Sequence, residues 1–238
     1  MLEARGVEKV FGGRELAVRA LHPTQLSVQP GEVVVVMGPS GSGKTTLLSI
    51  LGLVLEPTHG EVRVDGRVVT GESADLLAQL RRDRLGFVFQ QFNLLAGLSA
   101  LDNVALPLLL RGTGPGERSR RARSALGRVG LAGKVEAKAR QLSVGQQQRV
   151  AIARALVADA GVLLCDEPTA SLDSETGREV LATLKGLAHT EGRAVVVVTH
   201  DERVLRIADR LVRVEDGRAR EDERFRPAER EEPDAPSD

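Results

Sequence analysis

The chain has 238 residues, 42% of them hydrophobic, which is enough for one large domain or for one core with a smaller lobe. Its charge balances at +0, from 33 basic and 33 acidic residues, whereas a general nucleic-acid binder is usually basic. With 2% aromatic residues and no Trp or Tyr, it also lacks the side chains of a surface that stacks single-stranded nucleic acid.

Cysteine content and apolar runs bear on the compartment and on membrane insertion. A single cysteine, Cys165, cannot form an intrachain disulfide or a cysteine-based metal cluster, which fits a reducing compartment. Residues 1–20 contain no apolar core long enough for a signal peptide, and the longest apolar runs, at 33–37 and 106–110, are too short to span a bilayer. We therefore expect a soluble or peripheral protein that needs a partner for any role in a membrane.

The N-terminal part of the chain predicts an antiparallel sheet. The segment 60–69 alternates apolar and polar residues around Asp65-Gly66, a dipeptide typical of hairpin turns. Together with the first 30 residues, this segment predicts an antiparallel flank.

Three other apolar runs predict a parallel sheet. Residues 32–38, 161–167 and 193–200 are almost continuously apolar and end in polar residues, as do strands that are buried on both faces between layers of helices. No convincing strand occurs within 98–157, which predicts a helical lobe. Inside this lobe, the Arg-rich run 118–130 is interpreted as a solvated helix face rather than a nucleic-acid patch.

The sequence GPSGSGKT, after the first of these strands, has the spacing G-x-x-x-x-G-K-[ST] and opens a helix. Glycines let main-chain N–H groups close around phosphate oxygens, and the helix N-terminus favours an anion. Lys44 is expected to reach the β- and γ-phosphates, and the Thr45 hydroxyl to hold Mg²⁺. A flexible glycine turn is the alternative, which the strand, the spacing and the helix together disfavour. The predicted nucleotide-binding residues of this loop are Gly38, Pro39, Ser40, Gly41, Ser42, Gly43, Lys44, Thr45 and Thr46.

Two adjacent carboxylates, Asp166 and Glu167, end the buried run VLLCDE. Neighbouring strand residues point to opposite faces, so the two carboxylates are expected to have different roles. Asp166 fits a second Mg²⁺ anchor acting through water, and Glu167 is placed to polarise an attacking water. An ordinary polar strand end is the alternative. Cys165, which precedes them, is interpreted as a small buried residue.

Gln90 and His200 each follow the end of a strand-like run. Strand ends beside a phosphate-binding loop are where nucleotide-contacting groups collect in α/β folds. Taken alone, each residue has an ordinary interpretation, as a solvated loop glutamine and a strand-end histidine. Only the whole ordered set of motifs makes them candidates for a site.

In this order, the motifs resemble those of ABC-type ATPases. The chain carries Walker A GPSGSGKT, a Q-loop glutamine, signature LSVGQ, Walker B VLLCDE, D-loop SLD and a switch histidine, and the resemblance covers about residues 2–217. It implies an α/β fold with a P-loop NTPase (RecA-like) core, an antiparallel β subdomain and a helical subdomain at about 95–157, all within a single domain, 1–220. The charged, proline-containing segment 221–238 is expected to be a disordered tail.

The resemblance also implies roles for individual residues. Glu167 resembles the general base, His200 the γ-phosphate sensor, and Gln90 the group that touches Mg²⁺ and the lytic water. Phe11 sits where the family places an aromatic ring against adenine, with a core side chain of the N-terminal sheet as the alternative. With ATP and Mg²⁺ as ligands, the implied catalytic residues are Glu167, His200, Gln90 and Lys44, and the implied metal ligands are Thr45, Gln90 and Asp166.

The signature departs from the family's usual L-S-G-G-Q at Val144. Ser143-x-x-Gln146 predicts a capping box, which places Val144 at N1, where ordinary helical φ does not require glycine. Gly145 falls at N2, where a side chain would keep the backbone away from a phosphate. We therefore expect Val144 to be tolerated and Gly145 to be required.

By resemblance, two copies of the chain pack head to tail, and each ATP lies between the Walker A loop of one copy and the signature of the other. The cycle of closing and opening would drive integral membrane permease subunits from the cytoplasmic face of the inner membrane, with no nucleic acid as partner. The coupling surface is expected after Gln90, where Phe92, Leu94 and Leu95 form either an apolar docking patch or part of the lobe's core. The residues implied to act across the dimer are Ser143, Val144, Gly145, Gln146 and Asp173.

The favoured function is an ATP-hydrolysing subunit that drives export or extraction of a lipoprotein, peptide or hydrophobic compound. The lipoprotein-release and macrolide-exporter group is favoured because its members resemble this chain in two stretches, GFVFQQFNLLAGLSALDNVALPLLLRG and LSVGQQQRVAIARAL. A soluble ABC ATPase acting on DNA or ribosomes is disfavoured by the single cassette, the lack of a long heptad insertion and the balanced charge. A mechanochemical or cell-division complex that transports nothing is the other alternative, and intact Glu167 and His200 do not exclude it. No motif identifies the cargo.

Overall fold

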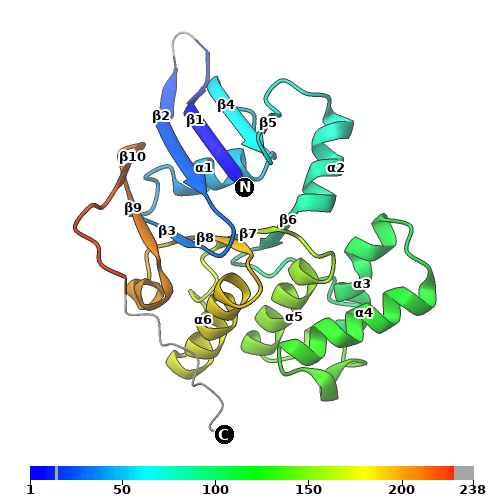
Figure 1. Ribbon diagram of the computed structural model, residues 1–238. Helices are drawn as coiled ribbons and strands as arrows, with labels where there is room; N and C mark the ends of the chain where they lie inside the picture. The colour runs from blue at the N-terminus through cyan, green and yellow to red at the C-terminus, as the bar shows by residue number, and fades with distance from the viewer. Residues whose placement is uncertain (14–15, 228–238) are drawn as a thin grey trace, which may run out of the picture.

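The computed structural model describes residues 1–13 and 16–227, and it contains two sheets that pack in layers with helices (Figure 1). Sheet A is antiparallel and has the strand order β2-β1-β4-β5. Its strands are β1 (Leu2–Phe11), β2 (Val18–Val28), β4 (His59–Val64) and β5 (Arg67–Val68).

The predicted turn at Asp65-Gly66 joins β4 to β5. Both residues have φ in the left-handed region, at 50° and 81°, as tight hairpin turns of this dipeptide require. Arg63 pairs with Val68 across the hairpin. The antiparallel flank expected from the sequence is confirmed.

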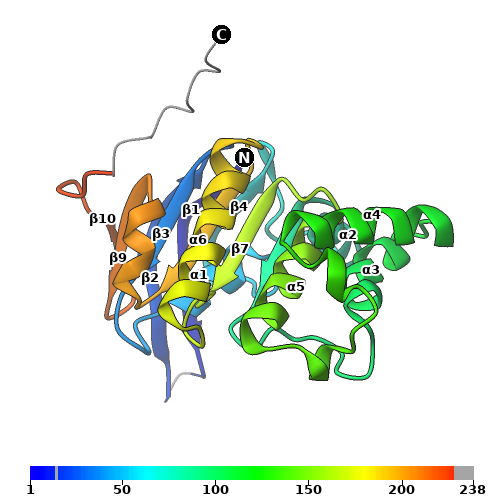
Figure 2. The same cartoon turned by 90° about the horizontal axis from the view of Figure 1, so that it is seen from below.

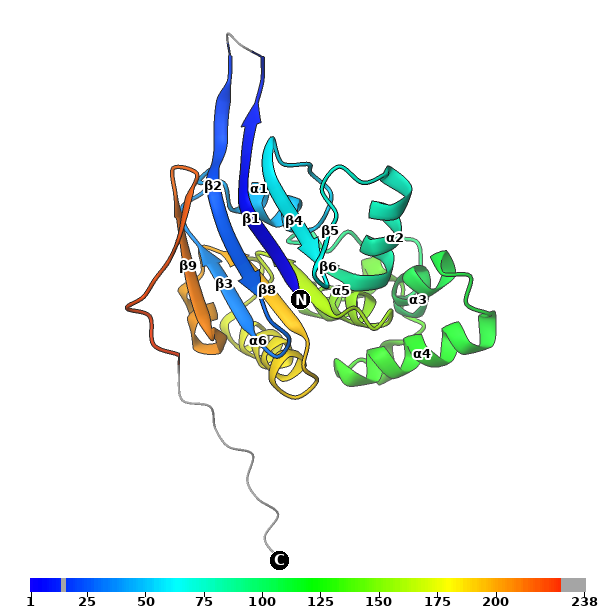
Figure 3. The same ribbon diagram turned by 45° about the horizontal axis from the view of Figure 1, so that its top comes forward.

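Sheet B has the strand order β10-β9-β3-β8-β7-β6 and is parallel except for its edge strand β10. Its strands are β3 (Val33–Met37), β6 (Leu85–Val88), β7 (Val162–Asp166), β8 (Ala194–Thr199), β9 (Arg210–Glu215) and β10 (Arg218–Glu221). It lies between sheet A on one side and helices α5 and α6 on the other (Figure 3).

Strand β3 shows why the central runs are continuously apolar. Val33 and Val35 belong to a core shared with the helices, whereas Val34 and Val36 belong to a second core shared with sheet A and α1 (Lys44–Leu51). All of these valines are 0% exposed. A strand covered on both faces has no solvent side, so alternation is lost and the predicted parallel sheet is confirmed.

The segment 98–157 is helical, and among the described residues it contributes no strand to either sheet, as predicted. Its helices form a lobe beside the β6 edge of sheet B, away from the β9–β10 edge (Figure 2). The helices of this lobe are α3 (Ala100–Leu110), α4 (Pro115–Arg128) and α5 (Val144–Leu156), with two short 3-10 turns, η1 (Ala132–Lys134) and η2 (Ala139–Gln141). Elsewhere lie α2 (Ala74–Arg84), α6 (Ser174–His189) and the 3-10 helix η3 (Glu202–Ile207).

The Arg-rich run forms most of α4, and its arginines are largely neutralised by carboxylates. They make ion pairs within α4 and with neighbouring segments, so this surface carries little unpaired positive charge. This agrees with the solvated helix face predicted from the sequence. The pairs are Arg120 with Glu117, Arg121 with Asp159, Arg123 with Glu136, and Arg128 with Glu191.

The domain boundary predicted after residue 220 falls inside a folded segment. Glu221 is the last residue of β10 and pairs with Arg210 at 2.7 Å, while the N–H of Asp222 donates to the Leu211 carbonyl at 2.8 Å. Phe225 packs against the core shared with the helices. The rest of the predicted tail, 228–238, lies outside the described residues.

No helix in the described part of the chain is both long and apolar enough to cross a membrane.

Candidate active site

The Walker A loop connects β3 to α1, and its two flanking glycines are required by close neighbours. A Cβ on Gly38 would lie 2.0 Å from the carbonyl oxygen of Val214, and a Cβ on Gly43 would lie 2.4 Å from that of Ala20. Gly43 also has φ of 105°, which side-chain-bearing residues rarely adopt. The loop therefore presses its backbone against β2 and β9, as a phosphate cradle requires.

Lys44 begins α1 and folds back over this loop. Its ammonium donates to the carbonyls of Gly38 and Pro39 at 2.7 and 2.8 Å, and the residue is 7% exposed. Ser42 Oγ is buried and has no hydrogen-bond partner among the described residues. A loop that holds both an unsatisfied hydroxyl and a lysine ammonium suits an incoming oxyanion. A pocket of about 150 Å³ opens here, lined by Ala20, Gly41, Gly43, Lys44, Thr45 and Thr46.

The β9–β10 hairpin supports the loop from outside, which the sequence did not indicate. The N–H of Gly217, in the hairpin turn, donates to the Ser42 carbonyl at 2.9 Å, and the N–H of His22 donates to the Gly217 carbonyl at 2.8 Å. Gly217 has φ of 74°. The turn thus links β2 to the Walker A loop.

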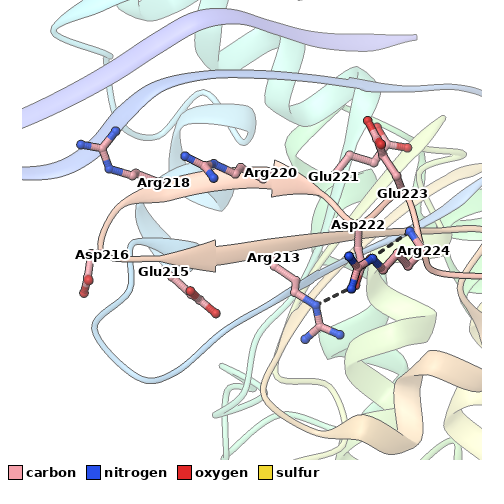
Figure 4. A pocket seen from close by; sticks show the side chains of 9 residues that line it. All are labelled: Arg213, Glu215, Asp216, Arg218, Arg220, Glu221, Asp222, Glu223 and Arg224. Carbon is pink, nitrogen blue, oxygen red and sulfur yellow. Dashed lines mark hydrogen bonds and ion pairs between the residues drawn. The ribbon is translucent and has the colours of Figure 1, made fainter.

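Charged side chains of both signs surround the outer face of this hairpin (Figure 4). Arg213 Nε donates to Asp222 at 2.7 Å, and the N–H of Arg224 donates to the same carboxylate at 3.1 Å. Acidic and basic groups alternate here, so the depression shows no preference for a ligand of one charge.

Glu167 and His200 meet at the ends of the adjacent strands β7 and β8. His200 Nδ1 lies 2.6 Å from Glu167 Oε1, which also accepts the His200 backbone N–H at 3.1 Å. The other carboxylate oxygen, Oε2, accepts the Thr199 hydroxyl at 2.7 Å. The carboxylate is therefore fixed on both oxygens.

The backbone of Glu167 is strained in a way that aims this carboxylate. Its φ is 48°, and a non-glycine residue in a sparsely populated region costs about 1–3 kcal/mol. Its N–H donates to the Val198 carbonyl at 2.8 Å, which ties the turn to β8. Such strain is typical of functional positions.

Asp166 and Gln90 lie at the same edge of sheet B. Burial raises the pKa of the Asp166 carboxyl, and so does the Glu167 charge, while Lys44 opposes the rise. Val88, the last residue of β6, pairs with Cys165, so Gln90 emerges just beyond Asp166 and is exposed. Cys165 itself is fully buried, and burial raises the pKa of its thiol to about 12, as expected for a packing residue.

Phe11 ends β1, and its ring is 43% exposed with Lys9 Nζ 5.3 Å from its centre. Phe11 is therefore an exposed side chain and not a core side chain of the N-terminal sheet. Phe11 pairs with Val18 of β2, and Ala20 of the same strand lines the loop pocket.

The signature forms the predicted capping box at the start of α5. Ser143 Oγ accepts the Gln146 N–H at 3.3 Å, and Gln146 Oε1 accepts the Ser143 N–H at 3.1 Å. Val144, at N1, is 46% exposed, so its side chain points away from the core.

A side chain at Gly145 would collide with a residue of the same chain, and it would not project into open space in front of the helix. A Cβ at this position would lie 2.3 Å from Thr176 Cγ2, in the first turn of α6. Asp173, the N-cap of α6, accepts the N–H groups of Glu175 and Thr176 at 3.0 Å each. The signature helix and the D-loop helix therefore touch at a glycine, a contact that the sequence reasoning missed.

The expected coupling segment is partly buried and partly exposed. Leu94 packs against the core, whereas Leu95 is 51% exposed. Arg154 of α5 donates to the carbonyls of Phe92 and Asn93 at 2.7 and 2.5 Å. Beside this segment runs a groove of about 500 Å³, whose apolar lining is Leu85, Phe87, Phe89, Leu106, Pro107 and Leu110.

The chain also matches a known family model and curated proteins over most of its length. Residues 21–170 match the family model described as ABC transporter. The chain is 48% identical over 222 residues to a macrolide export ATP-binding/permease protein MacB of Rhodospirillum rubrum, covering 93% of this chain and 34% of that protein. It is likewise 48% identical over 224 residues to a MacB of Paracoccus denitrificans, covering 94% and 33%. The chain thus spans about a third of the length of these relatives.

A solved structure gives the corresponding match in three dimensions. The dimeric ATP-binding cassette MJ0796, in a post-hydrolysis state bound to ADP and Pi, superposes with a TM-score of 0.86 at 44% identity. The alignment covers 93% of this chain and 98% of that one.

Proposed function

The chain belongs to the ABC transporter family, and from this premise we propose that it binds and hydrolyses ATP to power an export complex in a membrane. The observation that carries the proposal is the Glu167–His200 contact of 2.6 Å at the sheet edge that also presents the Walker A loop. The structure therefore supports a base and a phosphate sensor held together beside a phosphate cradle.

The proposed reaction is attack of water on the γ-phosphorus of ATP. Glu167 takes a proton from the water, the bond from the γ-phosphorus to the β,γ-bridging oxygen breaks, and ADP leaves. His200 then faces the γ-phosphate oxygens, and Lys44 exchanges its loop carbonyls for the β- and γ-phosphates. Thr199 and the His200 N–H keep the carboxylate aimed during proton transfer.

The residues expected to hold Mg²⁺ fit a hard cation, which takes oxygen ligands. Thr45 is exposed at the start of α1, and Asp166 is a half-buried carboxylate whose pKa is raised by burial and by Glu167. A dication there would favour ionised Asp166, and Gln90 offers a third oxygen. When bound, Mg²⁺ would neutralise charge on the β- and γ-phosphates.

We assign the second half of the site to another copy of the chain. Ser143, Val144 and Asp173 are exposed, and the start of α5 presents N–H groups and a helix dipole to an anion. The related cassette MJ0796 was solved as a dimer with ADP and Pi. Two copies packed head to tail would each complete the other's nucleotide site.

The permease is proposed to dock at the apolar groove beside the coupling segment. Leu110 is 72% exposed and Phe89 is 36% exposed at its rim, which is unfavourable in water and suits an apolar helix of a partner. The relatives named above join an ATP-binding part to a permease in one protein. We place the chain at the cytoplasmic face of the inner membrane on this basis.

Two measurements test the proposal. The chain should release phosphate from ATP only with Mg²⁺, and it should copurify from membranes with a polytopic permease. Leu110→Glu should abolish copurification while sparing nucleotide binding. Val54→Glu, at a similarly exposed site that lines a different pocket, should leave copurification intact. Phosphate release without membrane association would leave an ATPase and refute the transport role.

Phe11→Ala is expected to weaken ATP binding about tenfold, because stacking of a base on an aromatic ring contributes about 1–3 kcal/mol. Phe11→Tyr should retain wild-type affinity, since the ring is preserved. Equilibrium binding of ATP and of a nucleoside triphosphate with another base would be measured for the wild-type chain and both variants. Unchanged affinity for ATP in Phe11→Ala would show that adenine does not stack on this ring.

A further inference from the structure

An ion pair directly after His200 is not used by the reaction proposed above. Arg203 Nε donates to both oxygens of Asp201 at 3.0 and 2.9 Å, and a second guanidinium nitrogen lies 2.8 Å from the same carboxylate. Asp201 Oδ2 also accepts the Thr169 hydroxyl at 2.7 Å. The Asp201 side chain is 13% exposed, so these charge-assisted bonds are partly shielded from water.

On one side, the Asp201–Arg203 ion pair is connected through hydrogen bonds to Glu167, the proposed general base. The N–H of Asp201 donates to the Thr199 hydroxyl at 3.0 Å, and that hydroxyl donates to Glu167 Oε2 at 2.7 Å. A displacement of Asp201 would therefore move the hydrogen-bond donor that fixes the Glu167 carboxylate.

On the other side, the ion pair holds the loop that follows Glu167. Thr169 is fully buried, and its carbonyl accepts a guanidinium N–H of Arg203 at 3.3 Å. The preceding carbonyl, of Pro168, accepts Gln148 Nε2 of the signature helix at 2.9 Å. A Cβ on Gly177 of α6 would lie 3.3 Å from the Arg203 guanidinium, so α6 packs against it.

We propose that Thr169, Asp201 and Arg203 act together as positioning residues that clamp the loop after Glu167 to the loop after His200. The inference rests on the proposed hydrolysis and goes beyond it, because none of the three residues touches the reacting atoms. The clamp fixes the base and the sensor relative to each other. Displacements of about 1 Å at reacting groups can lower the rate a hundredfold. Loss of the clamp is therefore expected to lower the rate of hydrolysis.

The test compares Arg203→Ala with Arg206→Ala. Arg206 is an exposed arginine of the same 3-10 helix, and among residues 1–13 and 16–227 its side chain hydrogen-bonds only to the Arg203 backbone carbonyl. Arg203→Ala is expected to lower kcat for ATP about tenfold with KM changed less than twofold, because the Walker A loop is untouched. Arg203→Lys should recover part of kcat. Thr169→Val, which removes one hydroxyl, should lower kcat without unfolding the chain, and its effect should not add to that of Arg203→Ala.

Histidine NMR separates this inference from the proposed function, because it reads the position of His200 without turnover. The chain has 4 histidines, and His200→Gln identifies the signal. The Nδ1 signal of His200 should shift in Arg203→Ala and in Thr169→Val but not in Arg206→Ala. An unmoved signal, or a kcat no lower than that of Arg206→Ala, would overturn the clamp. A wild-type chain without turnover would refute the proposed function, and the NMR shift would still decide the clamp.

Discussion

Glu167→Gln is expected to lower ATP turnover by about 10²- to 10⁴-fold, the range that general base catalysis contributes. The amide keeps the size of the carboxylate, and its oxygen can still accept the Thr199 hydroxyl or the His200 N–H, but it cannot take a proton from water. Nucleotide binding should be unchanged, since Lys44 bonds to its own loop and not to Glu167. Phosphate release at saturating ATP and equilibrium binding of ATP measure the two quantities separately.

The same variant tests the two-copy site, because ATP that is not hydrolysed should hold the copies together. With Mg²⁺ and ATP, Glu167→Gln should run as a dimer in size-exclusion chromatography with light scattering. Glu202→Gln, which removes an exposed carboxylate three residues after Thr199, is the matched control and should turn over ATP normally. More than a tenth of wild-type turnover in Glu167→Gln would assign the base elsewhere, and an inactive variant that stays monomeric would contradict the shared site.

The elements predicted correctly are those set by local rules. Asp65-Gly66 specifies its turn through the φ values that two residues can adopt, and the valines of β3 specify a strand covered on both faces. The two ends of the capping box, Ser143 and Gln146, are three positions apart, so its hydrogen bonds could be anticipated from spacing alone. The charges around Glu221 favoured a disordered tail from residue 221, but Glu221 lies in β10. Its carboxylate and that of Asp222 are paired with Arg210 and Arg213 of the neighbouring strand β9.

Contacts between distant segments could not be anticipated. The N–H of Gly217 supports the carbonyl of Ser42, and Thr199 orients Glu167, yet nothing in the local pattern of either member of a pair indicates the other. Sequence order placed Glu167 and His200 at strand ends. Their contact depends on β7 and β8 being neighbours in the sheet, which follows from the topology.

At Gly145, such a contact gives a different reason why glycine is required, while the expectation that glycine is required stays the same. Space for a phosphate was the reason inferred from the sequence, whereas the structure puts Thr176 Cγ2 2.3 Å from any Cβ at this site. Thr176 is β-branched, so few side-chain rotamers in the helix could move its Cγ2 away. Overpacking of this kind costs about 1–3 kcal/mol and would push the start of α5 away from α6.

Gly145→Asp is therefore expected to nearly abolish turnover, and Gly145→Ala to lower it about 5- to 150-fold, the equivalent of an overpacking cost of about 1–3 kcal/mol. Val144→Gly, one residue earlier at an exposed N1 position, should stay near the wild-type rate. The two explanations for Gly145 separate in the double variant Gly145→Ala/Thr176→Ser, which removes the clashing methyl group and retains the hydroxyl. Recovery of phosphate release in the double variant, with Thr176→Ser alone active, supports packing against α6 as the reason. Failure to recover, with both variants folded by thermal unfolding, would return the requirement to the space in front of the helix, where a phosphate of the second copy's ATP would lie.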